Sequence, residues 1–277
     1  MLFLIILIVL LILLILLILS TLNKKDNFKK DKSEIKIAII SVMYRPKSIE
    51  TWLQLHRNLG ICHFYIRLED TPELHTFLES QPDVTLQIGT SNHSNQYTSI
   101  MDRQLKMAND ALKLCRQDDI DWLIQIDCDE ILEGNLDEIK ELPETVDTFW
   151  MQNYEAVYEG IPTDSDNCFR AKFYKDCGKP DSECVSYVNG KGGGRVSDTV
   201  KSNGCHRFKG KLQEAKLKDL IVKHYESCDF EQYVKKYKRY QKGVKLSDIP
   251  FPYYRESILA KDDTEQLKQV YIKYRTV

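Results

Sequence analysis

Residues 121–132, Asp121-Trp-Leu-Ile-Gln-Ile-Asp-Cys-Asp-Glu-Ile-Leu132, carry the feature around which the rest of the chain can be interpreted. Trp122 to Ile126 form a short apolar run bounded by polar residues, as expected of a central strand in a parallel sheet. Asp127 and Asp129 follow at its carboxyl end, where open α/β sheets bind their ligands. On a regular strand, side chains two residues apart leave the same face. The stretch therefore predicts a buried strand that ends in paired carboxylates.

Paired carboxylates indicate a cation. Two carboxylates this close repel each other and are tolerated best with a positive charge between them. Hard oxygen ligands suit Mg²⁺ or Mn²⁺, with phosphate oxygens completing the coordination shell. Acidic residues after a strand also occur in ordinary turns and as helix N-caps. Asp127 and Asp129 are thus compatible with a metal site or with an ordinary turn, and the surrounding sequence is needed to distinguish these two interpretations.

Composition limits the classes of protein to consider. The chain has 277 residues, of which 43% are hydrophobic, and a formal charge of −2. This length allows one sizeable α/β domain with a full core, or two small ones. Because there is no basic excess, nucleic acid is not favoured as a partner.

The first residues of the chain predict a membrane anchor. Residues 2–19 are all Leu, Ile, Val or Phe. In a helix they would extend roughly 27 Å, close to the hydrocarbon thickness of a bilayer. A cleaved signal peptide is the alternative, but the basic n-region and the small-residue cleavage site are lacking. We therefore predict a transmembrane signal anchor at residues 1–22 and a lysine-rich stem or linker at residues 23–34.

Strands and helices alternate in the residues that follow. Alternation of this kind argues for a mainly parallel sheet with helices on both faces. Lys191-Gly-Gly-Gly-Arg195 matches neither a P-loop nor a dinucleotide fingerprint, and it is predicted as a flexible loop. Residues 255–277 are predicted as a peripheral helix of mixed charge. The expected strands cover residues 35–43, 62–68, 84–88 and 122–126, and the expected helices cover 48–60, 72–80 and 94–116.

This order of elements and the sequence DWLIQIDCDEIL resemble the D-x-D region of GT-A glycosyltransferases. The stretch is close to the W-x-x-x-x-D-x-D-E-[FI] form of family 2-like and family 92-like members, and the resemblance covers residues 36–245. It implies a GT-A fold, Rossmann-like and mainly parallel, at residues 35–250, with a C-terminal helical tail at 251–277. It also implies that the acids hold a divalent cation, Mn²⁺ or Mg²⁺, that grips a nucleotide-diphosphate sugar.

The same resemblance assigns roles to residues far apart in the chain. Asp127 and Asp129 would hold the cation with a late histidine, either His224 in HYESCDFEQYVKKYKRYQKG or His206. The ends of the first two strands would cradle the nucleoside, and an R-Q pair before the D-x-D strand and the passage NGK…R…HRF would face the phosphates. Each of these residues can also be read as a solvated loop residue. The predicted nucleotide-sugar-binding residues are Ser41, Arg45, Glu69, Asp70, Arg103, Asp127, Lys191 and Arg195.

Family 2 and family 92 enzymes are inverting, so the resemblance further implies a carboxylate that takes the proton of the acceptor hydroxyl. The candidates are Glu155, Asp164, Asp166 and Asp198, and Asp198 is preferred for its place beside the glycine-rich stretch. A UDP-sugar is the favoured donor and a glycan or glycoprotein the expected acceptor. The resemblance suggests a Golgi, ER or other endomembrane location. The lysines after the apolar run favour a cytosolic domain, so the orientation stays open.

Eight cysteines without a C-x-x-C spacing argue against a zinc site. One or two disulfides are expected among the five later cysteines if the domain is lumenal, and free thiols if it is cytosolic. Two other function classes stay open. A haloacid-dehalogenase-type phosphatase requires Thr or Val where this chain has Ile131. A non-catalytic, membrane-anchored carbohydrate-binding or scaffold protein needs none of the site residues.

Overall fold

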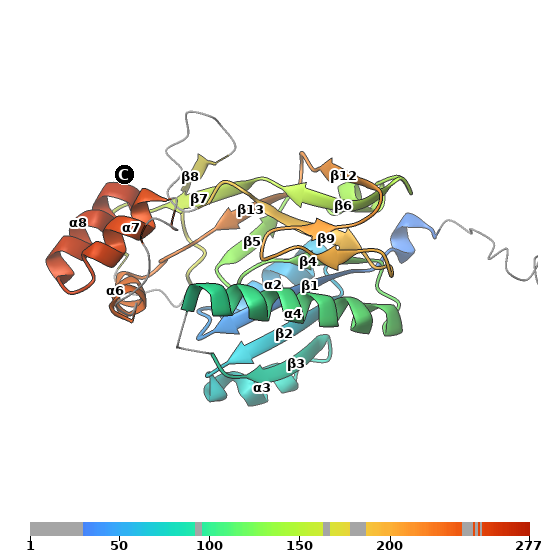
Figure 1. Ribbon diagram of the computed structural model, residues 1–277, viewed down its shortest axis with the longest axis horizontal. Coiled ribbons are helices and arrows are strands. Elements are labelled where there is room, and N and C mark those ends of the chain that lie inside the picture. The colour runs from blue at the N-terminus through green and yellow to red at the C-terminus, as the bar shows by residue number, and fades with distance from the viewer. Residues whose placement is uncertain are drawn as a thin grey trace, which may run out of the picture. The chain divides into compact units, whose positions relative to one another are not determined.

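The computed structural model describes residues 30–91, 96–162, 167–177, 187–239, 246, 249 and 251–277. The chain divides into two compact units, residues 1–34 and residues 35–277, and each is considered by itself. The described part of the first unit contains a short 3₁₀ helix, η1 (Lys32–Glu34). All elements named below belong to the second unit (Figure 1).

The first half of the second unit alternates strands and helices, as the sequence predicts. Its first four strands are parallel and lie in the order β3-β2-β1-β4, which is the order in one half of a doubly wound nucleotide-binding fold. Ligands of such sheets bind outside the carboxyl ends of the strands, where the order reverses. Here the order reverses between β1 and β4. The elements are β1 (Ile37–Tyr44), α2 (Ile49–Leu59), β2 (His63–Glu69), η2 (Pro72–Leu74), α3 (His75–Glu79), β3 (Val84–Gly89), α4 (Gln96–Gln117) and β4 (Trp122–Gln125).

Three later strands extend this sheet to seven strands, in the order β12-β6-β9-β4-β1-β2-β3. β9 is antiparallel to both of its neighbours, β4 and β6, whereas β6 and β12 pair in parallel. A second sheet has four strands in the order β5-β13-β7-β8, and β10 pairs with β11. These elements are β5 (Glu130–Glu133), α5 (Asp137–Lys140), β6 (Val146–Met151), β7 (Asn153–Val157), β8 (Phe173–Asp176), β9 (Lys191–Arg195), β10 (Lys201–Ser202), β11 (Phe208–Lys209), β12 (Gln213–Lys216) and β13 (Ile221–His224).

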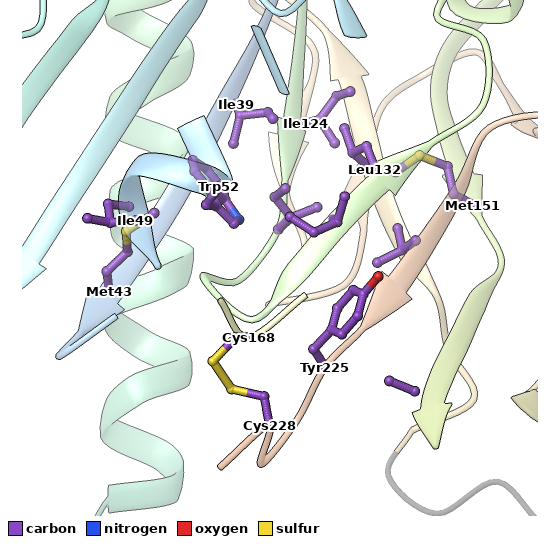
Figure 2. Packing of buried hydrophobic residues seen from close by; sticks show 14 of the residues in the cluster. Ile39, Met43, Ile49, Trp52, Ile124, Leu132, Met151, Cys168, Tyr225 and Cys228 are labelled. Carbon is purple, nitrogen blue, oxygen red and sulfur yellow. A yellow bond between two sulfur atoms is a disulfide. The ribbon is translucent and has the colours of Figure 1, made fainter. Parts of the chain in front are cut away.

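The central strand β1 is buried on both faces. Ile39 and Met43 belong to the larger core cluster together with Trp52 of α2 (Figure 2). Ile40 and Val42 belong to a separate cluster that includes residues of α4. Alternate side chains of a strand leave opposite faces, so two clusters are expected where helices cover both faces. Burying each large aliphatic side chain contributes about 1.5–3 kcal/mol, which explains the continuous apolar run of this strand.

Residues 191–195, predicted as a flexible loop, form the strand β9 inside the large sheet. A Cβ atom on Gly193 would lie 2.4 Å from the ring of Phe149. A Cβ atom on Gly194 would lie 2.6 Å from Cγ1 of Val200. The glycines therefore allow neighbouring side chains to pack closely against the strand. They do not make this stretch a flexible loop. The prediction was wrong because a glycine run can indicate either property.

Among the described residues, no helix is both long and apolar enough to cross a membrane. The longest of them, α4, has 22 residues but carries charges along its length, including Arg103, Lys106 and Asp110. The transmembrane anchor predicted at residues 1–22 lies outside the described residues. The predicted fold class is therefore corrected to a mixed α/β fold for which no transmembrane helix is supported. The predicted single-pass membrane location is corrected with it.

The C-terminal residues form three helices that gather at one end of the second unit (Figure 1). They are α6 (Phe230–Lys238), α7 (Pro252–Leu259) and α8 (Thr264–Arg275). The ring of Tyr233 in α6 lies 5.9 Å from that of Tyr253 in α7 and 5.1 Å from that of Tyr271 in α8, and all three are buried. Arg275 is also fully buried. The last helix was predicted as peripheral; one of its faces is exposed, and the other packs into the core through Leu267, Val270 and Tyr271.

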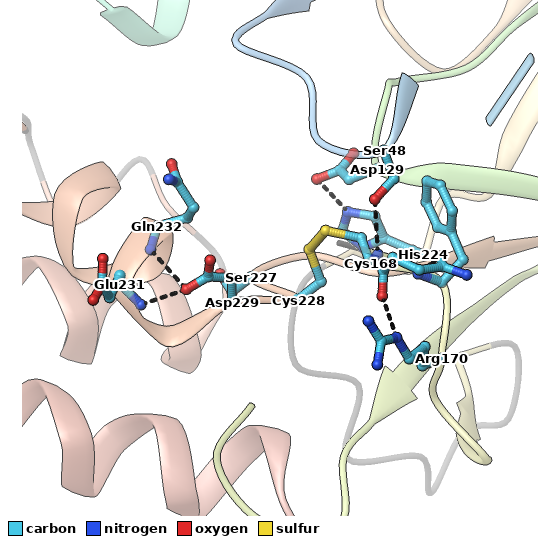
Figure 3. The surroundings of a disulfide bond; sticks show 12 residues. Ser48, Asp129, Cys168, Arg170, His224, Ser227, Cys228, Asp229, Glu231 and Gln232 are labelled. Carbon is cyan, nitrogen blue, oxygen red and sulfur yellow. Dashed lines mark hydrogen bonds and ion pairs between the residues drawn. A yellow bond between two sulfur atoms is a disulfide. The ribbon is translucent and has the colours of Figure 1, made fainter. Parts of the chain in front are cut away.

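A disulfide joins Cys168, in the segment after β7, to Cys228, which directly precedes the N-cap residue of α6 (Figure 3). Cys177 is disulfide-bonded as well. Disulfides among the later cysteines agree with one of the two expectations from the sequence. The Cys168–Cys228 bond ties α6 to the loop that follows β7.

We expect the double substitution Cys168→Ser/Cys228→Ser to lower the free energy of unfolding by about 4 kcal/mol. The two cysteines are 60 residues apart, and opening a loop of that size returns conformational entropy to the unfolded chain. Urea denaturation measures the loss. Cys62→Ser, which removes an exposed free thiol, is the control, and equal stability of the two variants would contradict the prediction.

His56 joins α2 to β5 and makes stability depend on pH. The Leu132 N–H donates to its Nε2 (3.1 Å), so the proton of the neutral ring is on Nδ1, which donates to the Trp52 carbonyl (2.8 Å). Burial lowers the pKa of His56 to about 4. A histidine with a lowered folded pKa keeps its full contribution above its unfolded pKa, near 6.5, and loses it as the pH falls toward 4.

We expect this effect of His56 to remove about 2–3 kcal/mol of stability between pH 7.5 and pH 4.5. Urea denaturation at the two pH values should show a smaller loss in His56→Gln than in the unmodified chain. His75→Gln, at a half-buried histidine in α3, is the control and should keep the full loss. An unchanged loss in His56→Gln would disprove the assignment.

Candidate functional site

The ends of β1, β2 and β4 lie at one edge of the large sheet. Tyr44 at the end of β1 pairs with Glu69 at the end of β2, and Ile40 of β1 pairs with Gln125 at the end of β4. Parallel pairing therefore brings Asp127, two residues after β4, to the same edge. This edge is also next to the reversal of strand order between β1 and β4, where a ligand site is expected.

Asp127 and Asp129 do not continue β4 but lie in a tight turn that leads into β5. The Glu130 N–H donates to the Asp127 carbonyl (3.2 Å), and the Asp127 N–H donates to Glu130 Oε2 (2.7 Å). A turn does not keep the two-residue period of a strand. The two aspartates accordingly have different partners, which corrects the expectation that they share one face.

Asp127 is held by two side chains. Gln104 Nε2 donates to its Oδ1 (2.7 Å), and Lys191 Nζ donates to its Oδ2 (2.5 Å). Lys191 is fully buried and also lies 3.2 Å from Glu130 Oε2. Burial alone would lower the pKa of Lys191, but Asp127 and Glu130 raise it above its ordinary value. Burial raises the pKa of Glu130 to about 7, against the effect of Lys191.

Tyr187 binds the second carboxylate oxygen of Glu130. Its hydroxyl donates to Glu130 Oε1, and its ring lies 4.9 Å from that of His206 and 5.1 Å from that of His224. His206 Nδ1 is 3.0 Å from the Gly190 carbonyl and donates to it. Burial and Lys191 lower the pKa of His206 to about 4, so its ring is neutral at pH 7. The rings of His206 and His224 thus both pack against that of Tyr187.

His224 reaches the site through the second sheet. It is the last residue of β13 and pairs with Glu130 of β5 and with Glu155 of β7. Its Nδ1 donates to Glu155 Oε1 (2.8 Å), and its Nε2 lies 3.5 Å from Asp129 Oδ2 (Figure 3). Burial alone would lower the pKa of His224, but Glu155 and Asp129 raise it well above its ordinary value. Burial alone would raise the pKa of Asp129, but His224 holds it low.

Asp129 and His224 fit a divalent cation. The side chain of Asp129 is 36% exposed, so it can be reached from solvent. A carboxylate on the second ring nitrogen, here Glu155, is the usual device that orients a metal-binding histidine. Carboxylate and imidazole ligands suit Mn²⁺. Asp127 fits less well as a direct ligand, because Gln104 and Lys191 engage both of its oxygens.

A complete protein cage for a metal is not present in the part of the chain that the structure describes. No group of three or more His, Cys, Asp or Glu side chains there is arranged to hold an ion. A cation on Asp129 and His224 would therefore take its other ligands from water and from phosphate oxygens, as Mg²⁺ and related ions commonly do.

The predicted nucleotide-binding residues of β2 and α4 also meet. Arg103 Nε donates to Glu69 Oε1 (2.6 Å), and Arg67 Nε donates to the same atom (2.8 Å). Arg103 directly precedes Gln104 in α4, so this helix connects Glu69 to Asp127. At the ends of β2 and β3, Asp70 accepts hydrogen bonds from the backbone and the hydroxyl of Ser91.

The structure places the two predicted residues of β1 differently. Ser41 is 1% exposed, and its hydroxyl has no hydrogen-bond partner among the residues described. It therefore does not line an open crevice. Arg45 follows the end of β1, is exposed, and has a guanidinium 5.4 Å from the ring centre of Tyr44. Only Arg45 of the two is placed to meet a ligand.

The structure does not bring Arg195 or Asp198 to Asp127. β9 is antiparallel to β4, so Lys191 lies near Asp127 while Arg195 pairs with Trp122, at the amino end of β4. The guanidinium of Arg195 lies 4.3 Å from the centre of the Trp122 ring. Asp198 is 91% exposed and 3.6 Å from Arg116. Both predictions are corrected, because the glycine-rich stretch is an extended strand that separates its two ends.

Of the other predicted catalytic bases, Glu155 is fully buried between His224 and Arg275. This position makes it a structural partner of His224 rather than a base for a substrate. Asp164 and Asp166 lie outside the described residues. Two further residues of the site, Tyr187 and Arg275, were not predicted. Neither has a local sequence signal, because each reaches the site only through contacts distant in sequence.

Comparison with known proteins gives distant relatives. No family model matches the chain. One similar protein, from Arabidopsis thaliana, is named glycosyltransferase-like; it is 23% identical, over 65% of this chain and 51% of its own length. A second Arabidopsis thaliana protein of that name is 24% identical, over 63% of this chain and 43% of its own length. The chain spans about half the length of these curated relatives.

Two solved structures are loosely similar. HddC from Yersinia pseudotuberculosis has a TM-score of 0.34 and 9% identity, over 72% of this chain and 96% of its own. The CTP:phosphocholine cytidylyltransferase LicC from Streptococcus pneumoniae has a TM-score of 0.28 and 14% identity, over 84% of this chain and 87% of its own.

Proposed function

We propose that this protein is a glycosyltransferase of the GT-A type that uses a nucleotide-diphosphate sugar, with a UDP-sugar as the favoured donor. One observation carries the proposal: Asp129 faces His224 at the carboxyl end of β4, and Glu155 orients the histidine. The glycosyltransferase-like names of the two Arabidopsis relatives support the same class of enzyme. We propose a glycan or glycoprotein as the acceptor.

In this proposal, Asp129 and His224 hold the cation, Mn²⁺ or Mg²⁺. A bound cation acts as a Lewis acid on the leaving diphosphate. Asp127 has a different role from the one predicted: with Lys191 and Gln104 it holds the turn that presents Asp129. Glu69 and Asp70 lie at the end of the neighbouring strand β2, and Arg103 of α4 binds Glu69; all three would contact the nucleotide.

We propose an inverting reaction, which requires a carboxylate to accept the proton of the acceptor hydroxyl. Glu155 and Asp198 are unsuited to this role by burial and by location. Asp164 and Asp166 are the two remaining candidates for this proton-accepting carboxylate, and each should be mutated. A general base typically contributes 10²–10⁴-fold to the rate, so the correct substitution to asparagine should be easy to recognise.

We expect the full chain to bind UDP in the presence of Mn²⁺ with a dissociation constant in the micromolar range, or about −8 kcal/mol. Chelation of the metal with EDTA should abolish this binding, because a cation held by Asp129 and His224 would supply the positive charge that the diphosphate requires. Isothermal titration calorimetry measures both, and a panel of UDP-sugars then identifies the donor. Binding of neither UDP nor GDP would overturn the proposal and favour a non-catalytic scaffold. Release of phosphate from simple monoesters would favour a phosphatase.

A further inference from the structure

The end of the chain is built into the sheet that carries His224. The Tyr158 N–H donates to the Arg275 carbonyl (2.8 Å), and the Val277 N–H donates to the Tyr158 carbonyl (3.1 Å). These bonds form a parallel bridge between Thr276 and Tyr158, next to the end of β7. The backbone of Arg275 is thus anchored to Tyr158. Tyr158 lies three residues after Glu155 in the chain, and Glu155 belongs to β7.

The buried side chain of Arg275 binds two carboxylates. Its Nη1 donates to Glu155 Oε2 (2.9 Å), and its Nη2 donates to Glu226 Oε2 (2.9 Å). Lys236 of α6 donates to the other oxygen of Glu226 (2.7 Å). Burial alone would raise the pKa of Glu226, but Lys236 and Arg275 lower it to about 2.

These contacts make one continuous series of alternating charges. It runs from the partly exposed Asp129 through buried groups to the partly exposed Lys236 in the C-terminal helices. A buried ion network is on average no more stabilising than apolar residues of the same volume. Stability alone therefore gives little reason to place four charged groups behind one histidine. The series is Asp129, His224, Glu155, Arg275, Glu226 and Lys236.

We propose that Arg275 is a positioning residue for the cation site: it fixes Glu155, which in turn aims His224 Nε2 at Asp129. Glu155 shares its oxygens between the imidazole and the guanidinium. Removing Arg275 deletes the charged donor to Glu155 Oε2, an oxygen that also lies 3.0 Å from His224 Nδ1, so the direction of His224 is expected to be less fixed. The effect on cation binding rests on the proposed function, whereas the effect on His224 does not.

Two double variants test the positive charge of the Arg275 side chain, which faces Glu155. Both carry Glu226→Gln, so that neither leaves the buried carboxylate of Glu226 without its Arg275 partner. Arg275→Met/Glu226→Gln removes the positive charge, whereas Arg275→Lys/Glu226→Gln keeps it. Lys273→Met is the control in the same helix, since Lys273 pairs with the half-exposed Glu256 of α7 and not with Glu155 or Glu226 among the described contacts. Near-UV circular dichroism reports whether each variant keeps its tertiary packing.

Two readouts are measured on the full chain. Calorimetry with Mn²⁺ alone should show about tenfold weaker binding in Arg275→Met/Glu226→Gln, at the low end of the effect of losing a group that orients a metal-binding histidine. ¹⁵N NMR of the His224 ring, without metal, should show a changed Nδ1 resonance in the same variant. Arg275→Lys/Glu226→Gln and Lys273→Met should resemble the unmodified chain in both readouts.

Equal Mn²⁺ affinity and an equal His224 resonance in the two double variants would overturn the inference. If the methionine variant does not fold, Glu155→Gln breaks the same series one residue closer to His224, and an unchanged His224 resonance there would also overturn it. If the unmodified chain binds neither Mn²⁺ nor a nucleotide, the proposed function fails. The NMR comparison still decides in that case whether Arg275 positions His224.

Discussion

Asp129→Asn is expected to weaken the binding of Mn²⁺ and UDP by about 100-fold or more, since the loss of an outer-shell partner alone typically costs 10–100-fold. The amide keeps the size of the side chain but removes the negative charge that faces His224 at 3.5 Å. Because Asp129 is 36% exposed, the substitution should leave the fold intact. Calorimetry with UDP and Mn²⁺ measures the change, and circular dichroism checks the fold.

Two matched substitutions make this test specific. Asp198→Asn changes an aspartate that is 91% exposed at the other end of β9, and it should leave binding unchanged. Asp127→Asn should weaken Mn²⁺ binding less than Asp129→Asn, because Lys191 and Gln104 already engage both oxygens of Asp127. Equal losses in Asp127→Asn and Asp129→Asn would instead support the sequence-based assignment of both as metal ligands. Unchanged binding in Asp129→Asn would refute the cation site.

Lys191→Met is expected to lower the free energy of unfolding by about 3–5 kcal/mol, the usual cost of removing one partner of a buried ion pair. The ammonium group lies 2.5 Å from Asp127 Oδ2 and 3.2 Å from Glu130 Oε2. Methionine matches the length of lysine but leaves both carboxylates without their cation. Urea denaturation at pH 7 measures the change.

A control and a rescue variant sharpen the test of Lys191. Lys106→Met removes an exposed partner of Asp110 in α4, and such surface pairs contribute about 0.3–0.5 kcal/mol. Adding Asp127→Asn to Lys191→Met should recover part of the loss, because it removes the carboxylate charge that Lys191 had paired with. The recovery appears as a coupling energy in a double-mutant cycle. A loss in Lys191→Met no larger than in Lys106→Met would contradict the charge triad of the buried Lys191 with Asp127 and Glu130.

Local patterns in the sequence were sufficient for the parallel half of the fold. The apolar runs of β1 and β4 indicated strands buried on both faces, and the helical pattern of α4 between β3 and β4 indicated a crossover connection. Parallel strands end at one edge, so Glu69 and Asp127 could be placed together without a structure. The predicted pair of Arg103 and Gln104 also lies at that edge, where each residue binds one of these acids.

Prediction failed where a pattern had two physical causes. The glycines of β9 permit either a flexible loop or close packing, and only the rings and side chains that approach them distinguish the two. Because the glycine-rich stretch is a strand antiparallel to β4, Arg195 and Asp198 lie toward the amino end of β4, away from Asp127. Likewise, two aspartates two residues apart share a face only on a strand. The turn at residues 127–129 directs Asp127 to Lys191 and Asp129 to His224.

The sequence by itself determined the mixed α/β class, the parallel strands and the edge at which Asp127, Asp129 and Glu69 gather. The class and the strands follow from hydrophobic periodicity, which acts over a few residues, whereas the place of Glu69 beside the aspartates was implied by the resemblance to GT-A enzymes. Only the tertiary structure decided that His224 faces Asp129, that Glu155 orients it and that Arg275 from the last helix holds Glu155. Glu155 and Arg275 are 120 residues apart in the chain. Burial makes each of these charges require a partner, but the fold alone determines which partner comes within reach.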